Sequence, residues 1–326
     1  MPLPKWLPPQ SRGSIDTLPS SLRDQTALLP DDTVTSSLRD QTALLPDASV
    51  ASGLVAFSAQ TAVLLVLIGF GVGAFGTVIG AGGGFILTPI LLLLYPHESA
   101  QTLTAISLTA VFFNAASGSA AYARQRRIDY RSGLVFALAT IPGAIGGALL
   151  VGDVSRRRFD SIMGAVRAAL AVWLLAGERW PLHQLRGYVE ERTIVDRSGQ
   201  SYHYMVPLKW GAVFSLGVGF LSSFLGIGGG VVHVPLLVRA FGFPTHIATA
   251  TSHFVLAIMA GTGTITHLLI GSFHHHGLRR TISLSIGVVA GAQLGAHISL
   301  RLHGRAIQWL LAVALLALSA RLLIGA

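Results

Sequence analysis

Long apolar segments separated by short polar ones make up most of the chain after Gly53. In the first half of this region the segments are 53–79, 83–95, 101–123, 132–151 and 159–176. In the second half they are 208–226, 229–242, 247–271, 280–300 and 305–325. A helix needs about 20 apolar residues to cross a hydrocarbon core of about 30 Å, and most of the segments approach or exceed that length. Because lipid offers no hydrogen-bond partner to a free backbone group, these segments should be α-helices.

The second segment of each half is shorter than the others and is interrupted by glycine and proline. Segments 83–95 and 229–242 are too short to cross the membrane comfortably. The sequence therefore predicts an all-α integral membrane protein, with two homologous halves of about five hydrophobic segments each and one short Gly/Pro-broken helix per half. Such a chain is a multi-pass protein of the cell membrane.

The first 52 residues differ in kind from the rest. They are rich in Pro, Ser, Thr, Asp and Leu, and they contain the sequence SSLRDQTALLPD at 20–31 and again at 36–47. Two copies are too few for a solenoid. A polar segment of this type predicts a disordered tail at 1–52, without a role in the chemistry.

The polar insert between the halves has its own pattern. Two β-prone stretches, at 193–195 and 201–204, flank a turn that contains Gly199. Paired stretches of this kind are typical of a small β-hairpin. We therefore expect an extramembrane loop at 178–207 with a hairpin in it.

The two halves repeat each other in three places. The matched pairs, in chain order, are GAGGGF at 80–85 (then Pro89) with GIGGGV at 226–231 (then Pro235), TAIS at 104–107 with TATS at 249–252, and Gly143 and Gly147 with Gly291 and Gly295. Their order predicts an internal duplication, with one membrane repeat at 53–177 and a second at 208–326. If all five segments of a half cross the membrane, the second half is inverted. If the short segment only dips in and returns, the halves are parallel, and the basic loops do not decide between the two.

Composition agrees with a membrane location. Hydrophobic residues make up 52% of the chain and charged residues 11%, whereas soluble domains have about 25% charged residues. The absence of cysteine excludes disulfides, thiolate metal sites and cysteine nucleophiles. The net charge of +9 lies in short clusters between apolar segments, which is typical of membrane flanks and argues against nucleic-acid binding.

The placement of carboxylates narrows the class of substrate. No apolar segment carries Asp or Glu near its middle, and the chain contains neither after Val206. Proton pumps and cation carriers usually place such residues at mid-membrane. This placement therefore favours a small anion over a cation as the substrate.

The two glycine triplets are the strongest candidate site. Glycines at membrane depth let the backbone leave a helix, and a short helix can then start with free N–H groups that bind an anion. Short interrupted segments at matching positions of two halves are typical of transporter binding sites. The alternative is that these glycines only allow close helix packing.

Hydroxyl groups follow each triplet. Thr104 and Ser107 in the first half and Thr249 and Ser252 in the second stand where they could donate to an oxyanion. The alternative is that each hydroxyl bonds a carbonyl of its own helix. Asn114 and Gln293 are amides inside apolar segments, where a helix–helix bond and a ligand are equal alternatives.

Histidines are concentrated in the second half. With no carboxylate nearby, His233 and His253 are candidates for proton coupling near neutral pH. The alternative for each is one hydrogen bond to a neighbouring helix. The loop cluster His274, His275 and His276 supports a second function, a divalent metal-cation transporter that uses second-half histidines.

The repeated motifs resemble those of a known transporter family. The pattern G-x-G-G-G-[FV]-x-x-x-P occurs twice, each copy is followed by T-A-x-S, and P-G-A-x-x-G stands at 142–147. Together they resemble the TauE/SafE sulfite exporter family over about residues 53–326. The resemblance implies a membrane carrier without a cofactor for sulfur-containing anions such as sulfite, sulfoacetate or other organosulfonates. It implies a substrate site at 80–84 and 226–230 with Ser107 and Ser252, made asymmetric by His253 where the first half has Leu108.

The sequence thus predicts a secondary carrier or facilitator, and not an enzyme, that binds a small anion between two short-helix N-termini. One half would rock against the other. A homodimer is an alternative that the sequence leaves open, and no metal site is assigned. The predicted substrate-binding residues are Gly80, Gly82, Gly83, Gly84, Thr104, Ser107, Gly226, Gly228, Gly229, Gly230, Thr249, Ser252 and His253.

Overall fold

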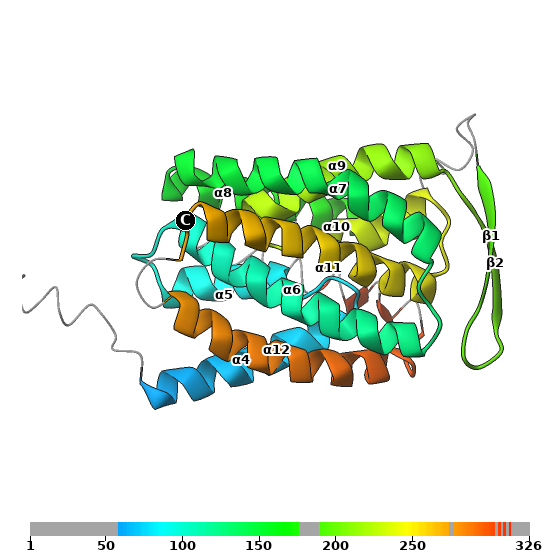
Figure 1. Ribbon diagram of the computed structural model, residues 1–326, viewed down its shortest axis with the longest axis horizontal. Helices are drawn as coiled ribbons and strands as arrows, with labels where there is room; N and C mark the ends of the chain where they lie inside the picture. The colour runs from blue at the N-terminus through cyan, green and yellow to red at the C-terminus, as the bar shows by residue number, and fades with distance from the viewer. Residues whose placement is uncertain are drawn as a thin grey trace, which may run out of the picture. The chain divides into compact units, whose positions relative to one another are not determined.

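The computed structural model describes residues 58–175, 189–273 and 277–303, together with Ala306, Ile307, Trp309, Leu310 and Val313. The predicted tail at 1–52, the cluster His274–His276 and most of the last apolar segment lie outside the described residues. Within them the chain is mainly helical, and six helices are long and apolar enough to cross a membrane. They are α4 (Ala59–Val78), α6 (Ala100–Arg124), α7 (Tyr130–Leu150), α9 (Leu208–Leu225), α11 (Thr245–Leu269) and α12 (Gly277–Ser299) (Figure 1). The prediction of a helical, multi-pass membrane protein is confirmed.

The fifth apolar segment also forms a helix, but it is not among these six. Helix α8 (Arg156–Leu175) begins RRRFD, and so has four charged residues in its first five positions. Arg156 donates to the backbone carbonyls of Leu92 and Glu98, at 3.1 and 2.7 Å. The start of α8 is therefore tied to the segment that precedes α6.

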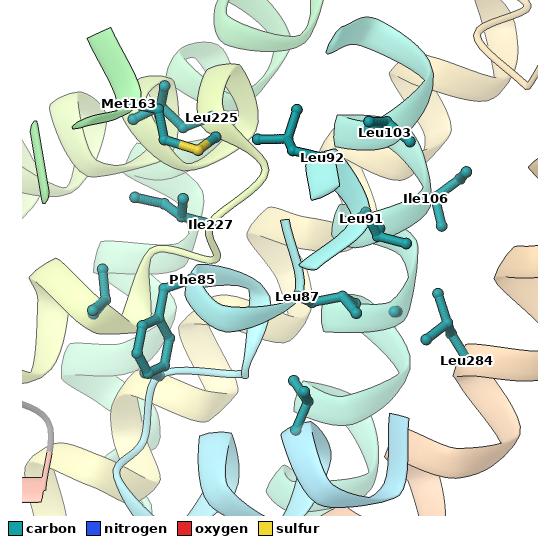
Figure 2. Close-up of a cluster of buried hydrophobic side chains, with 14 of the residues drawn as sticks. Phe85, Leu87, Leu91, Leu92, Leu103, Ile106, Met163, Leu225, Ile227 and Leu284 are labelled. Atoms are coloured by element: carbon teal, nitrogen blue, oxygen red, sulfur yellow. The ribbon is translucent and has the colours of Figure 1, made fainter. Parts of the chain in front are cut away.

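Two short helices begin at the last glycine of each triplet. Helix α5 (Gly84–Leu94) contains Pro89, and helix α10 (Gly230–Pro235) continues as a π-helical turn, η3 (Leu236–Ala240). Figure 2 shows that α5 lies inside the main apolar core, where Phe85, Leu87 and Leu91 are almost fully buried. Apolar side chains of α6, α8, α9 and α12 belong to the same core. This burial holds the start of α5 in a defined place.

Two pairs of long helices join distant parts of the chain. A Cβ atom added at Gly291 would lie 2.1 Å from the Phe70 carbonyl oxygen, and one at Gly295 would lie 2.2 Å from that of Ala74. Helices α12 and α4 are therefore parallel and in backbone contact (Figure 1). Helix α7 packs on α9 in the same way, since a Cβ at Gly143 would lie 2.1 Å from the Leu216 oxygen.

Helices α6 and α11 lie side by side and run in opposite directions. At the start of α6, Gln101 Nε2 donates to Ser272 Oγ, just after the end of α11, at 3.1 Å. Beyond the end of α6, the backbone N–H of Asp129 donates to Thr251 Oγ1, near the start of α11, at 3.0 Å. The bundle is thus built around an antiparallel central pair.

The polar insert contains two antiparallel strands, β1 (Glu190–Val195) and β2 (Ser201–Val206), with Thr193 opposite His203. Arg127 of the α6–α7 loop forms an ion pair with Asp196 at 3.0 Å, and Tyr204 donates to Asp129 at 3.0 Å. Although burial opposes ionisation, hydrogen bonds from Ser198 and Arg127 hold the pKa of Asp196 below its ordinary value. The ion pair therefore persists at neutral pH and keeps the hairpin on the α6–α7 loop.

Candidate anion site at the crossed glycine loops

The first glycine loop turns the chain from α4 into α5. Gly80, Gly82 and Gly83 have φ values of 77°, 72° and 80°, in the left-handed region that other residues rarely adopt. In the second loop Gly226 and Gly228 have φ values of 64° and 73°. Glycine at these five positions is therefore required by the backbone conformation itself.

The two loops are in direct backbone contact with each other. A Cβ at Gly84 would lie 2.8 Å from the Gly226 oxygen, and a Cβ at Gly230 would lie 2.2 Å from the Gly80 oxygen. Backbone atoms of the two loops therefore meet at these two points. The expectation that an anion lies directly between the two helix N-termini does not fit this conformation, because no room is left there.

Each predicted serine bonds the loop of the other half. Ser107 Oγ donates to the Gly226 carbonyl at 2.8 Å, and Ser252 Oγ donates to the Gly80 carbonyl at 3.3 Å. The first glycine of each loop is thus held by the serine that follows the other loop in sequence. In this conformation both serine protons are directed to carbonyls.

The two predicted threonines behave differently from each other. Thr249 Oγ1 donates to the Thr245 carbonyl of its own helix at 2.8 Å, which is the alternative weighed for it. The Thr104 Cγ2 atom would lie 3.1 Å from a Cβ at Gly226, while its buried Oγ1 has no hydrogen-bond partner within the described residues. Of these two threonines, Thr104 is therefore the one whose hydroxyl has no partner among the described residues.

Thr88 belongs to the same group, although the motif analysis did not single it out. Its Oγ1 lies 2.7 Å from the Gly226 oxygen and 2.9 Å from Ser107 Oγ. The only sequence signal is its position directly before Pro89 in the short helix. The matching position in the second half is Val234, so comparison of the halves hid this residue.

The two candidate histidines lie in separate polar groups. His253 Nε2 is 3.3 Å from Thr77 Oγ1, which in turn donates to Asn114 Oδ1 at 3.0 Å. His233 Nε2 is 3.1 Å from Ser215 Oγ. Both rings are buried, and each lies within hydrogen-bond distance of a hydroxyl on a neighbouring helix. Such a bond is the alternative to proton coupling that the sequence left open for each histidine.

A narrow space beside the second loop brings four predicted residues together. Its walls are formed by Gly229, Gly230, His233 and Ser252, with Val218, Val255, Leu256 and Met259. It is too small to admit a water molecule. The site is therefore closed in this conformation, and a ligand needs movement of the surrounding helices.

Charged groups lie away from the loops in the described part of the chain. The buried charged residues there are Arg127, Asp129 and Asp196 at the hairpin end and Arg280 at the other, where it pairs with Glu98 at 2.7 Å. Across the described ranges, no three His, Asp or Glu residues are close enough to hold a metal ion. The surroundings of the loops are neutral donors and apolar side chains.

Comparison with known proteins agrees with the motifs and the fold. The family model "Sulfite exporter TauE/SafE" matches residues 65–322. The chain is 30% identical to the probable membrane transporter protein YunE of Bacillus subtilis, covering 80% of this chain and 97% of the relative. It is 22% identical to the probable membrane transporter protein MJ0441 of Methanocaldococcus jannaschii, over 76% of this chain and 90% of that one.

A shorter match is to a relative whose name includes that of the family. Sulfite exporter TauE/SafE family protein 6 of Arabidopsis thaliana is 31% identical over 83 residues, which cover 26% of this chain and 19% of the plant protein. No solved structure matches the chain significantly. With six candidate membrane spans in its described part and a family match over most of its length, the chain belongs to the TauE/SafE sulfite exporter family of membrane transporters, which is not a family of enzymes.

Proposed function

We propose that this protein is a secondary carrier or facilitator for small sulfur-containing oxyanions, such as sulfite, sulfoacetate or other organosulfonates. The observation that carries the proposal is the pair of glycine loops in contact, each followed by a buried helix. The N–H groups of Ile86 and Leu87 donate to the Gly83 carbonyl, whereas those of Gly84 and Phe85 at the start of α5 have no acceptor among the described residues and attract negative charge. Hydroxyl and amide groups surround the loops, and the buried carboxylates of the described residues lie elsewhere. This chemistry suits an oxyanion better than a metal cation.

We infer that the substrate-binding groups are those of the two loops and the segments that follow them. The residues are Gly80, Gly82, Gly83, Gly84, Thr104, Ser107, Gly226, Gly228, Gly229, Gly230, Thr249, Ser252 and His253, to which we add Thr88. The crosswise serine bonds support this assignment, because they join both loops into one unit. Movement that breaks these bonds frees two hydroxyl donors for a ligand.

The same contacts support an inverted internal duplication of 53–177 and 208–326. Ser107 and Ser252 make equivalent bonds, and they belong to helices α6 and α11, which run antiparallel. Under the duplication α4 corresponds to α9, and α7 corresponds to α12. The packed pair α4–α12 therefore has the pair α7–α9 as its counterpart. An inverted repeat with a site at the repeat interface is a common plan of secondary transporters.

The helix pairing changes the expected motion. The sequence suggests that one half rocks against the other, but α12 of the second half is in backbone contact with α4 of the first. Such close glycine packing does not slide easily, because every shift meets backbone atoms. We propose that the pair α4–α12 moves against the pair α7–α9.

The test is thermal stability of the detergent-purified protein with sulfite, sulfoacetate, taurine, sulfate, Zn²⁺ or Ni²⁺. A ligand that binds only the folded state stabilises it by about 2.7 kcal/mol at 100 times its Kd. We expect a sulfur oxyanion to raise the melting temperature, and flux into proteoliposomes to follow for the same anion. A shift with the divalent metals alone would favour the metal-cation transporter and reject the oxyanion proposal.

Proton coupling through His233 or His253 is a separate prediction. We expect the pH dependence of transport between pH 5 and pH 8 to disappear in His233→Ala or in His253→Ala, because the ring is the proton carrier. The matched control is His297→Ala, an exposed histidine of α12. The measurement is the initial rate of anion uptake into proteoliposomes at each pH. Wild-type pH profiles in both buried-histidine variants would exclude the coupling role.

A further inference from the structure

Two corresponding environments flank the glycine loops, and they share one geometry. A Cβ at Gly118 would lie 2.6 Å from His253 Cδ2 and 3.2 Å from Thr77 Cγ2. A Cβ at Gly263 would lie 2.4 Å from Leu108 Cδ2 and 2.8 Å from Ser223 Oγ. The spacing from Gly118 to Gly263 is the one that separates Ser107 from Ser252. The two environments are therefore counterparts under the proposed duplication.

The counterparts differ in polarity. At this same spacing, Asn114 of the first environment corresponds to Met259, and His253 corresponds to Leu108. The fold thus accommodates a thioether and an isobutyl group where the first environment has an amide and an imidazole. Packing of this architecture does not require the polar pair, so the amide has another use.

Asn114 has unused hydrogen-bonding capacity. Its Oδ1 accepts from Thr77 Oγ1 at 3.0 Å, and Tyr122 fixes the same turn by donating to the Thr77 carbonyl at 2.7 Å. The Asn114 side chain is fully buried, and its Nδ2 has no partner within the described residues. Buried amide donors are nearly always paired, so this one indicates an acceptor that the described residues do not supply.

Asn114 lies beside the end of α4, about one turn along α6 from a residue that packs on the first glycine loop. Thr77 is in the last turn of α4, directly before the first glycine loop. Val111, one turn before Asn114 on α6, has methyl groups 3.2 Å from a Cβ at Gly82 and 2.6 Å from a Cβ at Gly84. The unpaired amide is therefore about one turn along α6 from the start of this 11-residue helix, where the N–H groups of Gly84 and Phe85 have no acceptor among the described residues.

We propose that Asn114 Nδ2 is a hydrogen-bond donor to the transported oxyanion at the first glycine loop, a role that rests on the proposed function. The ligand is a small anion with sulfur-bound acceptor oxygens, held by the amide and by the N–H groups of Gly84 and Phe85 at the start of α5. Thr77 orients the amide by occupying Oδ1, which leaves both Nδ2 protons for the ligand. The first loop is then the side of the pair that recognises substrate.

The experiment measures sulfite and sulfoacetate binding to the purified full-length protein by calorimetry, with three variants. Asn114→Met introduces the residue type of the counterpart position, and Asn114→Asp keeps the size and the Oδ1 acceptor for Thr77. Gln293→Met is the matched control, because it removes an amide of α12 that bonds Ser117 of α6. We expect Kd to rise about 10-fold or more in both Asn114 variants, as for loss of a hydrogen bond to a charged group. Gln293→Met should bind like the wild type.

The outcomes separate the two proposals. If the wild type binds a sulfur oxyanion and both Asn114 variants bind it equally well, the role of Asn114 is wrong and the proposed function stands. If the wild type binds none of these anions, the proposed function fails and the role of Asn114 fails with it. If Asn114→Met does not purify as a folded protein, the isosteric Asn114→Asp decides. If Gln293→Met raises Kd as much as the Asn114 variants do, the effect is a general one of removing amides, and the assignment is overturned.

Discussion

Gly230→Ala is expected to abolish transport and to lower stability. Its Cβ would lie 2.2 Å from the Gly80 oxygen and 2.7 Å from the Ala81 Cα. These neighbours are backbone atoms of the first loop and cannot rotate away, so the loops have to separate. Overpacking of this kind costs about 1–3 kcal/mol, and here it also displaces the start of α10. The measurements are uptake into proteoliposomes and the unfolding temperature of the purified protein.

Gly217→Ala is the matched control. Gly217 lies in α9, and a Cβ there would meet no atom within 4 Å. The substitution should leave transport unchanged and stabilise the helix by up to about 1 kcal/mol. Wild-type transport in Gly230→Ala would reject the contact between the loops as a requirement for function.

Substitutions at the other triplet glycines are expected to differ in severity. From the sequence, Gly83→Leu and Gly229→Leu are equally expected to abolish transport without preventing insertion. The structure separates them, because Gly83 has a φ of 80°, whereas Gly229 has a φ of −61° and would place its Cβ against the side chains of Val218 and Met259. Side chains can rotate away from an added methyl group, whereas the backbone atoms that face Gly230 cannot. Gly229→Ala should therefore be milder than Gly230→Ala, although the residues are adjacent.

The second large effect is expected from Gly291→Leu, which should prevent α12 from packing on α4. The added Cβ would lie 2.1 Å from the Phe70 oxygen and 2.8 Å from the Ala74 nitrogen. A bulky side chain at a backbone contact forces two whole helices apart, which should cost about 3 kcal/mol or more. The yield of folded protein in detergent and its unfolding temperature measure the effect.

Gly71→Leu provides the control for this prediction, because it adds the same side chain on the same helix pair. Gly71 lies on the exposed face of α4, and a Cβ there would have no neighbour within 4 Å. The variant should fold and melt like the wild type. If Gly291→Leu also melts like the wild type, the close α4–α12 contact does not stabilise the protein.

The positions of the helices were largely predictable from the sequence. The segment 101–123 corresponds to α6 (Ala100–Arg124), and the segment 83–95 corresponds to α5 (Gly84–Leu94). This agreement has a physical reason, since backbone in lipid must form its hydrogen bonds within the segment, and the apolar length then sets the helix. The membrane class followed from the same constraint, and the motifs led to the correct transporter family.

The candidate site was only partly predictable. Glycine at Gly80 and Gly226 suggests a break in a helix, and both residues do adopt positive φ. Their carbonyls accept from serines that lie more than a hundred residues away in sequence, and no local pattern specifies such a partner. Thr88 was missed for the same reason, because its shortest hydrogen bond is to the Gly226 carbonyl in the other half of the chain.

The sequence by itself determined where helices form, where they break and which residue types stand at the breaks, because these depend on local hydrogen bonding and on the apolar solvent. Only the tertiary structure decided which helices meet. The spacing of Gly287, Gly291 and Gly295 indicates a face for close packing, but any smooth helix surface could satisfy it. The packing of α12 on α4, and the contact of one glycine loop with the other, depend on shape complementarity over the whole bundle. No single segment encodes that complementarity.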